Sequence, residues 1–299
     1  MCEIPKDLID ELKKRNIEIC SVISVNEEKG RYVISALDKD KRDVCIKWNE
    51  SYNCLGITSL RKEMSVYRWL GKTDCVPRVV CNEEILVTEY IKESITFREW
   101  ILKNDDKESF SMFINEVVDK YKVFLMKLNE RRRDEVETLK TDTQLEGFLS
   151  KLLYSGPYLT KIHAFERIRN SLLRKTIERK FDVDISDNNF MIHGDFHLNN
   201  ILISDTKAYI IDVENVIYGN CNIELAYWYV QVWVLIYDNC EFVKILNNAV
   251  EVLLRMKFFD EKQFWNVVKL YRMAILLNSR FHKNEKKVKV MTLLSYCTE

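Results

Sequence analysis

Glycine, proline and paired cysteines are scarce in this sequence of 299 residues. Only seven Gly and three Pro occur, so no stretch has the composition of a flexible linker. The nine Cys are scattered and form no C-x-x-C pair, which argues against a disulfide framework and favours a reducing, cytoplasmic location. The four His include no clustered ligand set for zinc.

A long apolar run and an excess of one charge are also missing. The longest nearly apolar stretch, Leu225 to Tyr237, is interrupted by Gln231 and is typical of a buried helix rather than a membrane span. Met1 to Lys14 is charged and contains no apolar signal core. The 46 basic and 46 acidic residues cancel, so no overall field favours nucleic acid or an anionic membrane. We therefore expect no nucleic-acid partner and no membrane insertion.

What is present is a hydrophobic fraction of 47%, enough for a sizeable core in one or two lobes. Alternating apolar residues predict a small antiparallel sheet near the start of the chain. Its strands are expected at 17–25, 31–37, 44–48, 79–80 and 84–91, with helices at 5–16 and 59–70. The fold class expected from this pattern is α+β, because the rest of the chain is mainly helical.

Helical spacing dominates from Thr96 onward. Apolar residues recur every three or four positions from Phe110 to Leu128, which predicts one long helix with a wide apolar face. Asn222 is expected to cap a helix that begins near Ile223. The predicted helices of this larger region, besides the long one, lie at 145–154, 157–180, 223–237, 240–257, 260–282 and 284–296.

The chain is densest in chemistry between Met191 and Asp212. Phe190-Met191-Ile192 predicts a strand that enters a turn containing His193, Asp195, His197 and Asn200, and a predicted hairpin over 201–211 then ends at Asp212. A carboxylate such as Asp195 suits proton acceptance from an attacking hydroxyl. Asn200 and Asp212 offer the oxygen ligands that Mg²⁺ prefers. The alternative is a polar turn with a solvated hairpin, but the residue types, spacing and strand context together favour phosphoryl transfer.

The motif H-G-D-x-H-x-x-N followed by I-D, here His193 to Asn200 and Ile211-Asp212, resembles the aminoglycoside phosphotransferase and choline kinase family. The resemblance implies a two-lobed, protein-kinase-like fold. Residues 1–91 would form an N-lobe that binds nucleotide, and residues 92–299 a C-lobe with the catalytic loop, metal site and acceptor site. It also implies ATP or GTP as co-substrate, Mg²⁺ held by Asn200 and Asp212, and Asp195 as the catalytic base.

A lysine inside a predicted strand gives the second part of the resemblance. Lys47 lies within Cys45-Ile46-Lys47-Trp48, where a charge needs a partner, and Glu63 on the following helix offers one. In kinase-like folds such a lysine contacts nucleotide phosphates and such a glutamate positions it. The alternative is a strand-edge lysine in water and an ordinary surface glutamate.

Further site residues are expected from the same resemblance. Backbone groups near Glu89, Tyr90 and Ile91 would meet an adenine edge. His193 would lock the catalytic turn, His197 would brace the loop or approach the phosphates, and Glu214 would lie near the metal or acceptor. Glu224 is expected to anchor the helix cap behind the site.

The sequence also departs from the family pattern. No G-x-G-x-x-G occurs between the first strands, where Gly30 follows Glu27 and Glu28, whose side chains we expect to face solvent. Asp212-Val213-Glu214 replaces D-F-G, which argues against a protein kinase proper. Asn199 stands where the family often has glycine, and a left-handed conformation there would support a tight turn.

The acceptor stays open at this point. A cationic acceptor would need acids or an aromatic cage, and Tyr227, Trp228, Tyr229 and Trp233 follow the metal loop, although core packing is the favoured role for such residues. The predicted function is transfer of the γ-phosphate of ATP or GTP to a hydroxyl of an amino sugar, aminoglycoside, choline-like or other metabolite acceptor. The alternative is a catalytically silent kinase-fold binding or assembly protein. The lack of a glycine-rich phosphate loop favours this alternative. The presence of all five expected polar residues argues against it; these are Lys47, Glu63, Asp195, Asn200 and Asp212. The oligomeric state is not readable from the sequence.

Overall fold

The computed structural model describes residues 4–27, 30–50, 54–71, 73–82, 85–130, 182 and 190–277. The chain forms two compact units. The first unit comprises the described parts of Met1–Lys103, Asn115–Arg132 and Asn199–Val216, and the second comprises those of Asn104–Ile114, Arg133–Leu198 and Ile217–Glu299. The predicted lobe boundary between residues 91 and 92 stays a prediction.

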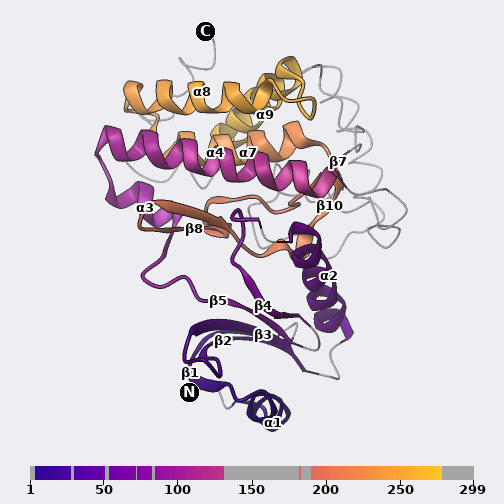
Figure 1. The fold of residues 1–299 in the computed structure, drawn as a ribbon. Coiled ribbons are helices and arrows are strands. Elements are labelled where there is room, and N and C mark those ends of the chain that lie inside the picture. Colours follow the sequence, from indigo (N-terminus) through magenta and orange to yellow (C-terminus); the bar gives the residue numbers. More distant parts are fainter. Residues whose placement is uncertain are drawn as a thin grey trace. The chain divides into compact units, whose positions relative to one another are not determined.

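The first unit contains a five-stranded antiparallel sheet among its described residues, in the order β1-β2-β3-β5-β4 (Figure 1). The strands are β1 (Glu18–Asn26), β2 (Arg31–Leu37), β3 (Asp43–Asn49), β4 (Val79–Asn82) and β5 (Leu86–Glu89). Each strand lies within two or three residues of its predicted bounds. The α+β class with a small antiparallel sheet is therefore confirmed.

Helix α1 (Lys6–Lys14) covers one face of this sheet. Its Leu8 and Leu12 are buried against apolar side chains of the strands, among them Ile34 and Ile46. Side chains alternate along a strand, so the residue after Ile46 points to the opposite face. That residue is Lys47, and α2 (Cys54–Leu70), which begins earlier than the predicted Ser59, contributes its partner on that side.

The predicted hairpin after the catalytic turn is also confirmed. Strands β8 (Ile201–Ser204) and β9 (Lys207–Ile210) pair antiparallel, and β6 (Ile95–Thr96) adds to β8. The backbone N–H of Ile210 donates to the carbonyl of Cys75 at 2.8 Å, which joins the hairpin to the segment after α2. The helical region predicted from Thr96 divides into α3 (Phe97–Lys103) and α4 (Lys107–Asn129).

In the second unit, β7 (Phe190–Ile192) pairs antiparallel with β10 (Ile217–Gly219). The helices that follow are α7 (Cys221–Ile236), α8 (Cys240–Leu254) and α9 (Glu261–Leu277). Helix α7 packs against both α8 and α9 and is buried on most sides, as its mainly apolar sequence requires. The helices predicted at 145–154, 157–180 and 284–296 lie outside the described residues.

The cap of α7 differs from the prediction. Asn220, not Asn222, is the N-cap, and its side chain accepts hydrogen bonds from the N–H groups of Asn222 and Ile223 at 2.8 and 3.3 Å. The Asn222 carboxamide oxygen instead accepts from Asp260 N at 3.0 Å, just before α9. Two asparagines two residues apart are equally good caps by type, so a tertiary contact decided between them.

Among the described residues, no helix is long and apolar enough to cross a membrane.

Leu8→Ala tests the packing of α1 on the sheet. Leu8 is fully buried, so we expect its truncation to lower the free energy of unfolding by about 2–5 kcal/mol, through lost burial and the cavity left behind. The measurement is urea unfolding followed by circular dichroism. Lys13→Ala, an exposed change in the same helix, is the control, and equal stability of the two variants would contradict this packing.

Candidate active site

Lys47 lies at the centre of a cluster of charged side chains in the first unit. Its Nζ is 2.6 Å from Oε1 of Glu63 and 3.1 Å from Oδ1 of Asp212. Glu63 is fully buried, and the Lys47 side chain is 17% exposed. The structure thus brings together three of the predicted site residues, from β3, α2 and the end of the hairpin. A lysine at a strand edge facing water would have no such partners.

The hairpin positions Asp212 through a backbone link to Asn200. The 3-10 turn η2 (Leu198–Asn200) ends at Asn200, whose carbonyl accepts a hydrogen bond from Ile211 N at 2.9 Å. Asp212 then adopts a left-handed conformation with φ of 62°, immediately before η3 (Val213–Asn215). This region costs a residue other than glycine about 1–3 kcal/mol, and such strain is commonly concentrated at functional sites. Asn200 itself is buried.

A third carboxylate and a second cation extend the cluster. Glu214, on η3, accepts a hydrogen bond from Nη1 of Arg31, and the same nitrogen lies 3.8 Å from Oε2 of Glu63. Arg31 is the first residue of β2 and is 5% exposed. Sequence reasoning missed Arg31. The signal available was an arginine directly after the Gly30 turn, at the start of a strand.

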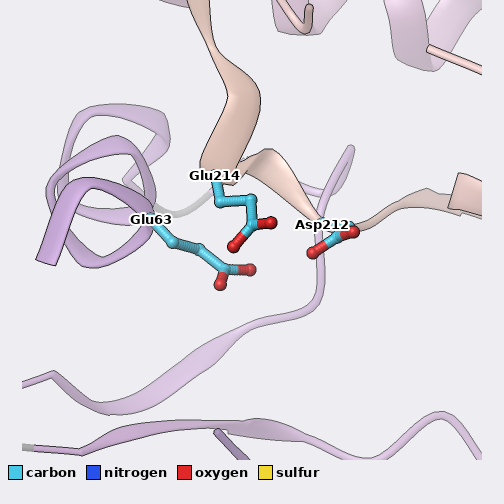
Figure 2. A group of neighbouring side chains, drawn as sticks. All are labelled: Glu63, Asp212 and Glu214. Atoms are coloured by element: carbon cyan, nitrogen blue, oxygen red, sulfur yellow. The ribbon is translucent and has the colours of Figure 1, made fainter. Parts of the chain in front are cut away.

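Figure 2 shows the carboxylates of Glu63, Asp212 and Glu214 turned toward one another. One oxygen from each can be chosen so that all three lie within 4.8 Å of one another. Oε2 of Glu63 is buried and has no hydrogen-bond partner among the described residues. Carboxylate oxygens are the ligands of hard divalent cations, so this donor set fits Mg²⁺. The sequence predicted Asn200 and Asp212 as metal ligands and Glu214 near the metal or acceptor, and the structure adds Glu63 to the group around Asp212.

The pKa values of Glu63 and Lys47 follow from their burial and from the opposite charges beside them. Burial raises the pKa of Glu63, and the adjacent Lys47 offsets only part of that effect. For Lys47, burial lowers the pKa, but Glu63 and Asp212 together outweigh it, so the net shift is upward. The ammonium of Lys47 therefore stays charged throughout the physiological range.

The predicted catalytic turn belongs to the second unit. His193 is fully buried, and its Nδ1 accepts a hydrogen bond from Asp195 N at 3.3 Å. Gly194 has φ of 80°, a conformation that glycine adopts without strain. His197 Nε2 lies 3.4 Å from Oδ2 of Asp195. Both histidines are thus placed to orient the turn around the predicted base.

The carboxylate of Glu224, on α7, accepts hydrogen bonds from the backbone of this turn. Its Oε1 accepts a hydrogen bond from His193 N at 3.0 Å, and its Oε2 accepts from Gly194 N at 2.5 Å. The expectation that Glu224 anchors a helix cap therefore assigned its carboxylate to the wrong partner. Glu224 is 31 positions from His193, so no local sequence pattern could have linked the two.

The aromatic residues of α7 serve the core. Trp228, Tyr229 and Trp233 are buried, and the rings of Trp228 and Phe196 stack with centroids 5.9 Å apart. The guanidinium of Arg272 lies 4.2 Å from the ring centroid of Trp233. This face already binds a cation of its own chain, which favours the packing role over a cage for an external cation.

Two of the three predicted adenine-edge residues have engaged backbone donors. Glu89 N donates to the carbonyl of Arg78 at 2.8 Å, and Tyr90 N donates to that of Asp43 at 3.1 Å. Ile91 accepts at its carbonyl from the hydroxyl of Ser94 at 2.8 Å. The contact of this segment with an adenine edge stays a prediction.

Two smaller expectations can be compared with the structure. Glu27 is exposed, as predicted, and Glu28 lies outside the described residues. Asn199 is part of η2 and is not among the residues with positive φ, so the left-handed conformation expected there is wrong. Between His193 and Asp212, positive φ angles occur at Gly194, Asp205 and Asp212 instead.

Comparison with solved structures identifies the fold. Wild-type aminoglycoside 2'-phosphotransferase-IIIa in its GDP complex has a TM-score of 0.53 and 14% identity, with 98% of each chain covered. A putative fructosamine-3-kinase from Thermobifida fusca YX-ER1 has a TM-score of 0.54 and 13% identity, with 99% of each chain covered. Ethanolamine kinase from Plasmodium vivax has a TM-score of 0.51 and 14% identity, over 98% of this chain and 84% of that one.

This protein therefore has the protein-kinase-like fold of the aminoglycoside phosphotransferase and choline kinase group, as the H-G-D motif implied. No protein-family model matches the sequence, and comparison with curated proteins finds no match.

Glu224→Gln tests the support of the catalytic turn. The amide replaces one of two carboxylate acceptors by a donor, and hydrogen bonds to charged groups contribute about 1.5–3 kcal/mol. We expect the amides of His193 and Gly194 to exchange with solvent at least about tenfold faster. Hydrogen exchange measures this directly, with Glu251→Gln on the exposed side of α8 as control. Unchanged exchange at both amides would exclude the supporting role.

Lys62→Met tests how burial and the nearby Glu214 carboxylate affect the pKa of Lys62. Burial lowers the pKa of Lys62 to about 8, while Glu214 acts in the opposite direction. In the unfolded chain the pKa of the Lys62 side chain is about 10.4, so the unfolded chain binds this proton more firmly. The free energy of unfolding of the wild type should therefore increase by up to about 1.4 kcal/mol per pH unit as the pH rises between these two values. The variant should lack this gain.

Urea unfolding at several pH values from about 7 to 10 measures the difference between the two proteins. Lys103→Met, at an exposed position of α3, is the matched control and should follow the wild type. Parallel stability curves for wild type and Lys62→Met would contradict the lowered pKa.

Proposed function

We propose that this protein is a cytoplasmic small-molecule kinase that transfers the γ-phosphate of ATP or GTP to a hydroxyl group of a small acceptor. The observation that carries the proposal is Lys47 Nζ held between Glu63 and Asp212, at 2.6 and 3.1 Å. A partly buried lysine with two acidic partners is a fixed positive charge of the kind that nucleotide phosphates require. The shared fold of solved small-molecule kinases supports the same class.

In the proposed reaction the first unit binds the nucleotide. Lys47 contacts the phosphates and Glu63 holds it in place, while the backbone beside Glu89, Tyr90 and Ile91 meets the base. Residues 1–91 would act as the nucleotide-binding lobe, and residues 92–299 would supply the acceptor side.

Asn200 and Asp212 would hold Mg²⁺, with Glu214 as a further oxygen ligand. The carboxylates of Asp212 and Glu214, together with the buried Oε2 of Glu63, which accepts no hydrogen bond among the described residues, fit a hard divalent cation. The bound metal supplies positive charge that neutralises the phosphates during transfer.

Asp195 acts as the base of the proposed transfer. As the acceptor oxygen bonds to the γ-phosphorus, the bond from that phosphorus to the bridging oxygen of ADP or GDP breaks, and the hydroxyl proton passes to the Asp195 carboxylate. His193 and His197 orient this carboxylate, as their contacts to the Asp195 backbone and side chain suggest.

The acceptor is proposed as an amino sugar, an aminoglycoside, a choline-like compound or another metabolite alcohol. The solved proteins of the same fold are named for fructosamine, ethanolamine and aminoglycosides. These compounds all carry both an amine and a hydroxyl group, so amino alcohols head the list of acceptors to test.

The alternative function is a kinase-fold binding protein without turnover. It is favoured by one specific observation, the replacement of a glycine-rich loop by a turn that leads into Arg31. Nucleotide binding without acceptor-dependent turnover would support it.

Asp195→Asn is the decisive variant. The wild type should release ADP or GDP in a Mg²⁺-dependent and acceptor-dependent manner across a panel of amino sugars, aminoglycosides, choline, ethanolamine and simple alcohols. Because the amide cannot accept the proton, the variant should lose about 10²–10⁴-fold in kcat with little change in nucleotide KM.

Asp205→Asn, a substitution at an exposed position in the turn between β8 and β9, should match the wild type. Turnover in Asp195→Asn at the wild-type rate would remove Asp195 from the reaction, and absence of nucleotide binding to the wild type would exclude the kinase proposal.

A further inference from the structure

Arg31 occupies the position where a glycine-rich loop would approach a nucleotide. It is the first residue of β2, directly after the turn that closes at Gly30. Its side chain nevertheless points to acids of its own chain and donates to Glu214 from Nη1. The Nε atom donates to Oδ1 of Asn49 at 3.3 Å. The buried guanidinium of Arg31 therefore lies at the predicted phosphate site.

The acids that Arg31 contacts belong to the group that fits a divalent cation. Glu214 and Glu63 both lie within reach of Arg31 Nη1, and both contribute to the three-carboxylate group with Asp212. A carboxylate oxygen that coordinates a metal can no longer give the same lone pair fully to a guanidinium. Arg31 and a metal therefore compete for Glu214.

Charge balance gives the direction of this competition. Three carboxylates face Arg31 and Lys47, and Lys62 adds a further positive charge near Glu214. A divalent cation at Glu214 carries twice the charge of the guanidinium and would repel it, so Arg31 gives way to the metal. Arg31 would then be released beside a triphosphate, for which its planar fork of donors is well matched.

We propose that Arg31 exchanges partners when the metal–nucleotide complex binds: it leaves Glu214 to the metal and pairs with the nucleotide phosphates. This inference rests on the proposed kinase function. Arg31 thereby takes the place of the backbone N–H groups that a glycine-rich loop would offer, and it keeps the acids neutralised while the site holds no nucleotide.

The exchange needs only a side-chain movement. The backbone of Arg31 is paired with Asn49 in the β2–β3 ladder, and Glu50 N donates to the carbonyl of Gly30 at 2.9 Å. The sheet thus fixes the Cα of Arg31 while its long side chain can turn from the acids to the phosphates.

Arg31→Met tests the proposal because competition predicts opposite changes in two affinities. Without its competitor, Mn²⁺ alone should bind at least about threefold more tightly, by analogy with partner loss at a charged hydrogen bond. The Mg²⁺ complex of a non-hydrolysable ATP analogue should bind about tenfold or more weakly, because a phosphate contact is lost. Electron paramagnetic resonance of free Mn²⁺ and titration calorimetry of the nucleotide measure the two affinities.

Arg42→Met is the matched control. Arg42 is a half-exposed arginine that pairs with Asp38 and Asp40 in the turn after β2, and its removal should leave both affinities unchanged. Arg31→Lys keeps the buried charge, which guards against misfolding from unpaired carboxylates. It should retain wild-type Mn²⁺ affinity but bind nucleotide more weakly, because the guanidinium fork is lost.

Opposite shifts in Arg31→Met support the exchange. Parallel loss of both affinities would show a merely structural arginine and overturn it, as would wild-type values for both in a folded Arg31→Met protein. In those two cases a wild-type protein that still binds nucleotide and turns over leaves the kinase proposal intact. Failure of the wild type itself to bind nucleotide would overturn both.

Discussion

The ion pair between Lys47 and Glu63 imposes the strictest requirement on the first unit. A buried carboxylate at 0% exposure is costly unless cations reach it. Meeting that need requires three segments far apart in the sequence: strand β3 with the lysine, helix α2 with the glutamate, and the hairpin that ends at Asp212. The sheet serves this arrangement by separating its faces. One face packs on α1 through apolar side chains such as Ile34 and Ile46, and the opposite face carries Lys47.

The same requirement explains the backbone strain at Asp212, one of several described residues other than glycine with positive φ. Asp212 is held in the left-handed region, and the hydrogen bond from Ile211 N to the Asn200 carbonyl leads directly into it. A relaxed extended residue there would send the carboxylate in another direction along the chain. The attraction of Lys47 for Asp212 offsets part of the conformational cost. In the second unit the turn at Gly194 avoids strain because glycine adopts positive φ freely, and the Glu224 carboxylate accepts hydrogen bonds from the N–H groups of His193 and Gly194.

The low sequence identity to solved proteins of the same fold is consistent with the different constraints on apolar core residues and polar site residues. Identities of 13–14% accompany coverage of 98–99% of this chain, because apolar positions tolerate exchange as long as volume and pattern are kept. Polar site residues cannot be exchanged so freely, since each has a specific partner. A fold hosts many activities, and for that reason the argument for a kinase rests on Lys47, Asp195 and Asp212 rather than on the architecture.

By itself, the sequence determined the elements whose signals are local. The alternation of β1 to β3, the helical spacing of α4 and the hairpin before Asp212 are visible in short windows, and so is the H-G-D motif. Only the tertiary structure decided which side chains meet. Arg31 pairs with Glu214 across 183 positions, Glu224 binds the turn 31 positions before it, and Asn220 rather than Asn222 caps α7. Such pairings depend on packing and strand register across the whole chain, so a short stretch of sequence does not predict them.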